Sequence, residues 1–351
     1  MIPSTRIFDG HNDVLTRLYK NGGIETAGEF VAGQKGHIDL PKAKKGDLGG
    51  GFFAIWVPTS DAQDDDFDAM KAKRYDIALP PSVNPGKALQ IAMQEAAILG
   101  RLEQIGALEI CLTAGQLRRC LESGKLAAIM HMEGAEAIDP DLHVLEVLYR
   151  AGLRSLGPVW SRPTIFAEGV PFRFPGSPDT GDGLTELGVN LVRRCNALRI
   201  MIDLSHITEK GFFDVAEHST HPLVATHSNA HALCPHVRNL TDDQLRAIAE
   251  TDGMVGVNFA ASFLRADGRM LTDVPLRQML RHFDHLISIA GEDRVGFGSD
   301  FDGALIPREI GDASGLQNLT AAMRDNGYGD DLIRKLCHEN WLRVLEMTWG
   351  G

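Results

Sequence analysis

A short apolar run followed by an amphipathic stretch recurs eight times along this chain of 351 residues. Each run is nearly continuously apolar and is bounded by glycine, proline or charge, which is typical of a parallel strand buried on both faces. Parallel strands need crossovers of about a dozen residues, usually helical, and the amphipathic stretches supply them. Eight such units predict an α/β fold, a (β/α)8 TIM-like barrel, rather than an open sheet. The predicted strands are residues 5–10, 51–57, 126–132, 154–160, 198–205, 222–227, 253–259 and 294–300.

The length suits one barrel, because such barrels run from roughly 200 to more than 400 residues as one domain. We therefore interpret residues 1–351 as a single domain. Two segments exceed a minimal barrel: residues 21–50 are rich in Gly and Lys, and residues 161–183 are rich in Pro and Gly. Each follows the C-terminal end of a predicted strand, so we expect both as insertions at that rim.

The composition argues against several kinds of partner. The chain has 47 acidic and 35 basic residues and a formal charge of −12, which argues against nucleic acid and against an anionic membrane surface. No run approaches the ~18 apolar residues of a membrane span, and we recognise no signal peptide before the first strand. The five cysteines form no CxxC pair, and we interpret them as reduced thiols. These features predict a cytoplasmic protein.

Metal-ligand and acid/base residues stand where the predicted strands end. They are His11, Asp13, Glu133, His206, His227, Asp300 and Asp302. The C-terminal ends of barrel strands carry the active sites of such proteins, and histidine–carboxylate clusters are the usual ligands of zinc and other divalent ions. A polar cap at a loop entrance would explain any one of them. Their recurrence at strand after strand favours a metal site at one rim.

The spacing indicates how two ions would be held. His11 and Asp13 are two residues apart on one strand, so their side chains point the same way and can reach one ion. Glu133 is placed to bridge two ions through its two oxygens, and His206 and His227 would complete the second. Two divalent ions about 3.5–4 Å apart can hold a hydroxide between them and polarise a carbonyl.

Other residues near this rim have two interpretations each. Asp300 is either a weak ligand or a base that passes a proton to a leaving nitrogen, which would equip the site to hydrolyse an amide or ester. Arg238 is interpreted either as a solvated or salt-bridged side chain or as a side chain that binds a substrate carboxylate through two parallel hydrogen bonds. His131 is either core filler or a partner of a metal ligand. We expect Asp203 to be structural and His236 to lie at the surface or rim.

Seven motifs, in order, resemble the membrane dipeptidase (renal dipeptidase) family of zinc peptidases within the amidohydrolase superfamily. They lie between about Ile7 and Asn340 and read DGHNDVL, the EG pair of HMEGAEAI, IDLSH, THSNA, VRNLTDDQL, GMVGVNF and GFGSDFDG. Members of this family hydrolyse dipeptides, often tolerate D-residues on the C-terminal side, and often form homodimers. The resemblance therefore implies a dipeptide substrate and a homodimer, and the chain looks like a soluble bacterial-type member.

The resemblance also implies a role for each site residue. Asp300 would be the proton-transferring carboxylate, and Arg238 would hold the C-terminal carboxylate of the substrate. Glu133 would bridge two Zn2+ ions. The remaining ligands would be His11 and Asp13 at one ion, and His206 and His227 at the other.

One position departs from the family pattern, and two other functions stay open. The family usually has a histidine near the scissile carbonyl after the fourth strand, where this chain has Pro158. Arg162, Trp160 or Arg173 of the adjoining loop could substitute for it. We expect one of the two arginines to supply the missing donor to the oxyanion, with the metal alone as the alternative. The other functions are hydrolysis of another small carboxylate-bearing amide or lactam, such as an N-acyl amino acid, and a non-catalytic barrel that binds metal or ligand.

Overall fold

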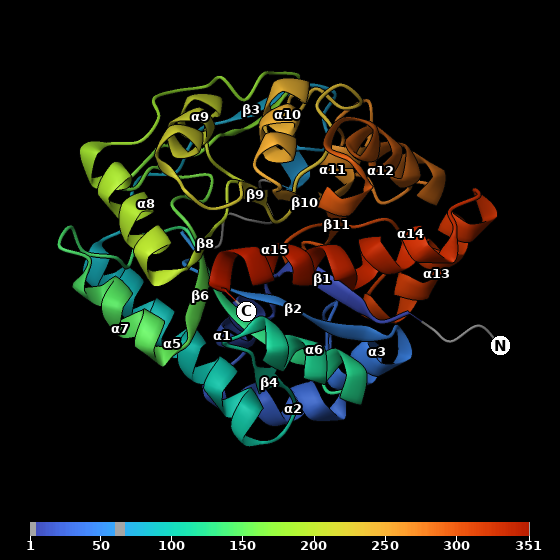
Figure 1. Cartoon of the computed structure of the whole chain (residues 1–351), viewed down its shortest axis with the longest axis horizontal. Coiled ribbons are helices and arrows are strands. Elements are labelled where there is room, and N and C mark those ends of the chain that lie inside the picture. Colours follow the sequence, from blue (N-terminus) through green and yellow to red (C-terminus); the bar gives the residue numbers. More distant parts are fainter. Residues whose placement is uncertain (1–4, 60–66, 351) are drawn as a thin grey trace.

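The computed structural model describes residues 5–59 and 67–350 and shows a nearly closed barrel of eight parallel strands with helices between them (Figure 1). Each of the eight overlaps a predicted strand, so the predicted fold class is confirmed. The barrel strands are β1 (Ile7–Asn12), β2 (Leu48–Trp56), β5 (Ala127–Glu133), β6 (Leu153–Gly157), β8 (Met201–Ile202), β9 (Val224–Ala225), β10 (Met254–Asn258) and β11 (Val295–Gly298).

The strands pair in sequence order around the barrel. The hydrogen-bonded path runs β8-β6-β5-β2-β1-β11-β10-β9. Its two ends meet at a parallel bridge between Asp203 and Val224, where the Leu204 amide donates to the Val224 carbonyl at 2.9 Å. β8 and β9 have only two residues each, so the barrel closes through few ladder bonds there. A further short strand, β4 (Glu109–Ile110), pairs with the start of β5 and was not predicted.

Apolar side chains fill the N-terminal end of the barrel, opposite the predicted site. Phe8, Phe52 and Met254 pack there against Trp341 of the last helix, whose indole N–H donates to the Phe297 carbonyl at 3.0 Å. That helix crosses the middle of the view in Figure 1. The packing is close: a Cβ added at Gly10 would meet the Trp341 ring at 2.6 Å. This end is therefore solid core, which leaves the C-terminal ends of the strands for function.

The helices lie around the barrel, and several begin at threonine caps. The side chains of Thr113, Thr185, Thr208 and Thr241 each accept a hydrogen bond from an amide of the first helical turn, which satisfies a donor that the helix itself leaves unpaired. None of the helices in the described residues is long and apolar enough to cross a membrane. The helices are α1 (Val14–Lys20), α2 (Ala27–Ala32), α3 (Leu40–Lys45), α5 (Pro85–Gln104), α6 (Ala114–Ser123), α7 (His143–Ala151), α8 (Glu186–Leu198), α9 (Glu209–His218), α10 (Asp242–Glu250), α11 (Ala261–Leu264), α12 (Leu276–Ala290), α13 (Leu316–Asp325), α14 (Asp330–Arg334) and α15 (Asn340–Trp349).

Two of the long connections carry structure of their own. The segment 21–50 contains a 3-10 turn, α2 and α3 before it enters β2. The segment 161–183 contains β7 (Phe172–Phe174), which pairs antiparallel with β3 (Tyr75–Ile77). β3 lies in the connection after β2, a stretch that the sequence did not single out. These two strands form a separate small sheet outside the barrel.

Candidate metal centre

The barrel brings five predicted ligands to its C-terminal mouth. His11 lies in β1 and Asp13 directly follows it, Glu133 ends β5, and His206 and His227 follow β8 and β9. All five side chains are buried. Parallel strands end at the same rim, so residues far apart in the sequence meet there.

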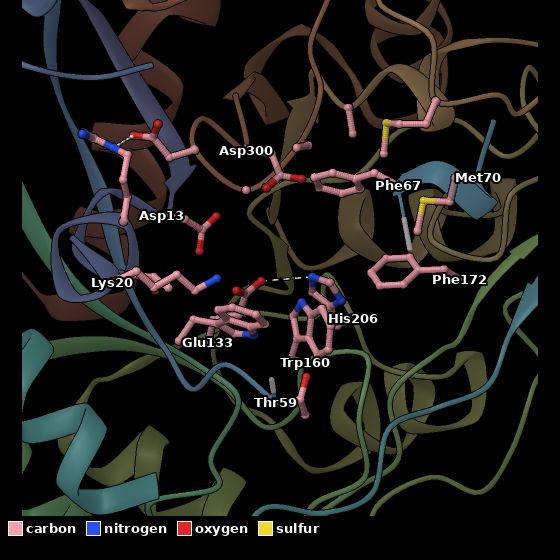
Figure 2. Close-up of a pocket in the computed structure, with 18 of the residues that line it drawn as sticks. Asp13, Lys20, Thr59, Phe67, Met70, Glu133, Trp160, Phe172, His206 and Asp300 are labelled. Atoms are coloured by element: carbon pink, nitrogen blue, oxygen red, sulfur yellow. Dashed lines mark ion pairs between the residues drawn. The ribbon is translucent and has the colours of Figure 1, made fainter. Parts of the chain in front are cut away.

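Glu133 lies between the histidines of this cluster. Its Oε1 is 3.0 Å from Nε2 of His206, 3.4 Å from Nε2 of His227 and 3.5 Å from Nε2 of His11. Figure 2 shows Glu133 and His206 facing each other across this short gap. Asp13 joins from the other side, with its Oδ2 3.5 Å from Nε2 of His11. One carboxylate therefore contacts all three imidazoles.

The ligand atoms form overlapping groups in which every atom lies within 4.8 Å of the others. The groups are Glu133 with His206 and His227, His11 with Asp13 and Asp300, and His11 with Asp203 and His227. The second of these contains Asp300 in the place where the sequence analysis expected Glu133. Glu133 nonetheless stays 3.5 Å from His11.

The donor chemistry fits divalent cations. Both ring nitrogens of His11 are buried without a hydrogen-bond partner among the described residues. Burial would lower the pKa of His11, but the charges of Glu133 and Asp13 outweigh it and raise this pKa to about 10. The cluster therefore favours positive charge at its centre. Imidazole and carboxylate together are the ligands that zinc and similar ions take.

The other two imidazoles are held neutral, which is the form that coordinates metal. Burial, followed by the charge of a nearby arginine or of His11, lowers the pKa of His206 and of His227 well below the usual value. Nδ1 of His206 lies 2.9 Å from the Ser161 hydroxyl, and Nδ1 of His227 lies 2.8 Å from the Thr226 hydroxyl. These hydroxyls orient each ring so that Nε2 faces Glu133, as partners behind a metal ligand do.

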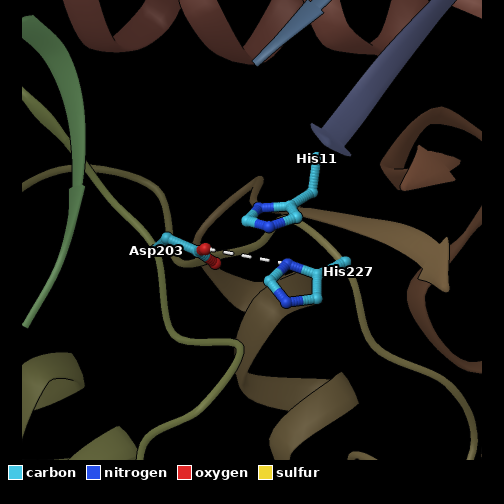
Figure 3. Close-up of side chains that lie close together, drawn as sticks. All are labelled: His11, Asp203 and His227. Carbon is cyan, nitrogen blue, oxygen red and sulfur yellow. Dashed lines mark ion pairs between the residues drawn. The ribbon is translucent and has the colours of Figure 1, made fainter. Parts of the chain in front are cut away.

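A buried hydrogen-bond network lies behind the ligands. Asp203 accepts from the amide and the hydroxyl of Thr226, at 2.8 and 2.6 Å, and from the Ser205 hydroxyl at 2.6 Å. Figure 3 shows Asp203 beside His11 and His227, with its Oδ2 4.0 Å from Nδ1 of His227. The predicted structural role of Asp203 agrees with these contacts, although its carboxylate lies close enough to the ligands to join one of the groups above.

His131 belongs to the same network rather than to the general core. Its Nδ1 lies 2.9 Å from the Ser155 hydroxyl, and its Nε2 is 3.6 Å from Oδ2 of Asp203. Its ring packs edge-on against His11 at 5.5 Å between centroids. Burial lowers the pKa of His131 to about 3, so it stays neutral. Of its two sequence interpretations, the partner of a ligand fits these contacts.

Asp300 is held above the ligands by an asparagine. Its Oδ2 accepts from Nδ2 of Asn258 at 2.9 Å, and its amide donates to the His11 carbonyl at 3.0 Å. Burial, and then the charge of Asp13, raises the pKa of Asp300 above that of an ordinary aspartate, which is the direction that favours a proton-transferring carboxylate. Asn258 was missed in the sequence; its place at the end of a predicted strand was the only available signal.

A tight turn sets the distance between Asp13 and Asp300. Asp300 and Asp302 have left-handed backbones, with φ of 59° and 68°. A Cβ added at Gly303 would lie 2.1 Å from Oδ2 of Asp13 and 2.4 Å from Oδ1 of Asp300, so only glycine fits between the two carboxylates. Asp302 does not join the ligands: its Oδ2 is 3.0 Å from Nε of Arg17, which ties the turn to α1.

Arg238 is a buried cation beside the ligands. Its guanidinium donates to the Ser205 carbonyl, and its Nη2 lies 3.2 Å from Nε2 of His206 and 3.3 Å from the His227 carbonyl. Its Nε has no hydrogen-bond partner among the described residues. Burial lowers the pKa of Arg238 to about 10, so it remains charged at neutral pH. A buried charge whose hydrogen-bond partners are neutral is costly unless an anion reaches it.

His236 is not at the surface or rim, as the sequence suggested. It is fully buried, because its ring packs against Phe263 at 4.5 Å between centroids. Its Nδ1 accepts from the amide of Arg238 at 3.0 Å. It therefore supports the segment that carries Arg238.

The expectation that Arg162 or Arg173 completes the oxyanion site is wrong. Arg162 is buried, with its Nη2 2.7 Å from Oε1 of Glu136. Nε of Arg173 pairs with Oδ1 of Asp76 at 2.8 Å, and both groups are exposed. Each of these arginines is thus already paired with a carboxylate, whereas the hydrogen-bond partners of Arg238 are neutral groups. Of the other candidates, Trp160 does line the cavity over the ligands, and stabilisation of the oxyanion by the metal alone stays a prediction.

A cavity of about 210 Å³ opens over the cluster. Figure 2 shows Glu133, His206 and Asp300 turned toward it, with Lys20 on one side and Phe172 on the other. A concave site in which charged groups converge with apolar walls is typical of a small-molecule site.

The barrel and its histidine–carboxylate cluster together define a class, the metal-binding barrels of the amidohydrolase type. A sequence model of the family described as membrane dipeptidase (peptidase family M19) matches residues 1–349. The chain belongs to this family, which confirms the resemblance found in the motifs.

Two solved structures and one further relative show the same relationship. The chain is 54% identical, with a TM-score of 0.96, to a metallopeptidase from Rhodobacter sphaeroides liganded with a phosphinate mimic of the dipeptide L-Ala-D-Ala; the match covers 99% of this chain and 100% of that one. It is 25% identical, with a TM-score of 0.80, to the probable dipeptidase PvdM from Pseudomonas aeruginosa, covering 98% and 96%. An uncharacterized protein in the pqqA 5' region of Klebsiella pneumoniae is 51% identical over 267 residues, covering 76% and 98%.

Proposed function

We propose that this chain is a dinuclear zinc dipeptidase that hydrolyses dipeptides with a free C-terminal carboxylate, including those with a D-residue at the C-terminal position. The observation that carries the proposal is Glu133, whose Oε1 lies within 3.5 Å of His11, His206 and His227. Family membership supports the reaction. The relative from Rhodobacter sphaeroides, liganded with a mimic of L-Ala-D-Ala, supports the substrate class.

In this proposal the cluster holds two ions that share Glu133. His11 and Asp13 would bind one ion, and His206 and His227 the other. When bound, such a pair lowers the pKa of water and polarises a carbonyl.

The side chains around the ions would position the substrate and move the proton. Asp300 has its Oδ2 held by Asn258, so Oδ1 is the atom that would take the proton of the attacking water and pass it to the leaving nitrogen. Arg238 would bind the substrate's C-terminal carboxylate, because its hydrogen-bond partners are two carbonyls and an imidazole rather than a carboxylate.

The direct test measures metal content and substrate range together. We expect two zinc ions per chain after gentle purification, and hydrolysis of L,L and L,D dipeptides. N-Acyl amino acids that carry the same C-terminal residues as these dipeptides should be poor substrates. Metal content near zero that added zinc does not restore would contradict the site, and faster hydrolysis of the N-acyl compounds would contradict the substrate class.

Arg238→Met should raise KM for dipeptides by about 10- to 100-fold with a smaller change in kcat, because a hydrogen bond to a charged group is worth about 1.5–3 kcal/mol and each 1.4 kcal/mol is tenfold. C-terminally amidated dipeptides should be poor substrates of the native protein, and Arg238→Met should reduce their hydrolysis little further. Arg173→Met, at the exposed rim, is the control. An equal loss on free and amidated dipeptides would show that Arg238 does not bind the carboxylate.

A further inference from the structure

The cavity over the ligands has two unlike sides. Figure 2 shows Asp13 and Lys20 on one side and Met70 and Phe172 on the other, with Glu133 between them. We call the second side the apolar lobe. It consists of Met70, Phe172, Ala260, Phe263, Met270 and Ala304.

The apolar lobe is built by rim segments that hydrogen bonds tie together. The Met270 amide donates to the Met70 carbonyl at 3.0 Å, and the hydroxyl of Tyr75 donates to the Gly268 carbonyl at 2.6 Å. Phe172 is fixed by the pairing of β7 with β3. The lobe is therefore a preformed part of the fold.

The lobe lies next to the proposed carboxylate anchor. The Arg238 guanidinium carbon is 5.4 Å from the centre of the Phe263 ring, and this ring stacks on Phe172 at 6.4 Å with an interplanar angle of 14°. The Phe172 ring in turn lies 6.5 Å from the ring of His206. The lobe thus extends from the anchor to the metal ligands.

This arrangement determines which substrate side chain the lobe meets. In a dipeptide the C-terminal side chain branches from the carbon that bears the free carboxylate. With that carboxylate on Arg238 and the scissile carbonyl over Glu133, this side chain lies against Phe263 and Phe172. The N-terminal residue then extends toward Asp13 and the polar side.

We infer that the apolar lobe takes the side chain of the C-terminal residue and makes the enzyme select dipeptides whose C-terminal residue is apolar. This inference rests on the proposed dipeptidase function. All six lobe residues are apolar, so a charged side chain would lose its water there without gaining a partner. An apolar side chain should raise kcat/KM, because one methylene in a hydrophobic pocket changes kcat/KM by roughly 10-fold or more.

The first test is a dipeptide series on the native, zinc-loaded protein. All members have N-terminal L-Ala, and the C-terminal residue is Gly, Ala, Met, Phe, Asp or Lys in either chirality. For the better chirality we expect kcat/KM to be at least about 10-fold higher for Met than for Gly, and at least about 100-fold higher for Met than for Asp or Lys. Equal rates for charged and apolar C-terminal residues would overturn the inference while leaving the dipeptidase function intact. Failure to cleave any member would overturn the proposed function itself.

The second test reverses the preference. Met270→Lys places an ammonium group in the lobe and should raise the Asp-to-Met ratio of kcat/KM by at least 10-fold, while the metal content and the thermal unfolding transition show that the fold survives. The matched control is Met93→Lys on α5, where the side chain is 47% exposed, and it should leave the ratio unchanged. Met270→Ala is the milder variant: it should reduce the preference for Met over Gly. An unchanged ratio in Met270→Lys with full metal content, or an unchanged preference in Met270→Ala, would place the C-terminal side chain elsewhere.

Discussion

Glu133→Gln is expected to lose both metal ions and to lower dipeptide hydrolysis by about 10³-fold or more, because polarisation by metal contributes several kcal/mol and each 1.4 kcal/mol is tenfold. The carboxylate oxygen Oε1 lies 3.0 to 3.5 Å from Nε2 of His11, His206 and His227. An amide keeps the size of this side chain but removes its charge, and it offers one oxygen instead of two. The measurement is metal content per chain together with kcat on the best dipeptide.

Glu136→Gln is the matched control for this change. Glu136 is also a buried glutamate, but its Oε1 pairs with Arg162 at 2.7 Å rather than with the histidines. This variant should lose stability and keep two ions per folded chain. If Glu133→Gln lost one ion and kept the other in full, Glu133 would be a ligand of a single ion and the bridging role would be wrong.

The fold and most of the cluster were predictable because both depend on local patterns. A strand buried on both faces is a continuous apolar run, and its C-terminal end is visible where that run stops. His11, Glu133 and His227 each stand at such a stop. The barrel then brings all strand ends to one rim, so no long-range information was needed to expect that these side chains meet.

Features that depend on contacts between distant segments were not predictable. β3 and β7 are three residues each and pair Tyr75 with Phe174, about a hundred residues apart in the chain; neither strand is long enough to show a period. The position of the Arg162 guanidinium depends on its ion pair with Glu136, and the spacing of residues in the sequence did not indicate this pair. Asp302 showed the limit of the strand-end rule, since a left-handed backbone turns it toward Arg17 and away from the ligands.

Asp300→Asn is expected to lower kcat by about 10²- to 10⁴-fold, the usual contribution of a general acid–base group, while KM changes little. The amide cannot take a proton from water. It can still accept the hydrogen bond from Asn258, which now holds Oδ2 of Asp300 at 2.9 Å. Asparagine also tolerates the left-handed backbone at this position, where φ is 59°, as few other residues do. The substitution therefore changes the chemistry and keeps the geometry.

Asp302→Asn, two residues further along the same turn, is the control. It makes the same chemical change at a φ of 68°, on a carboxylate that faces Arg17 rather than the metal ligands. It should cost only a few-fold in kcat, through the loosened turn. Metal content separates the two interpretations of Asp300 that the sequence left open. If Asp300 is a base, Asp300→Asn should keep both ions; if Asp300 is a metal ligand, the variant should lose one ion. Near-native kcat in Asp300→Asn with both ions present would mean that another group moves the proton.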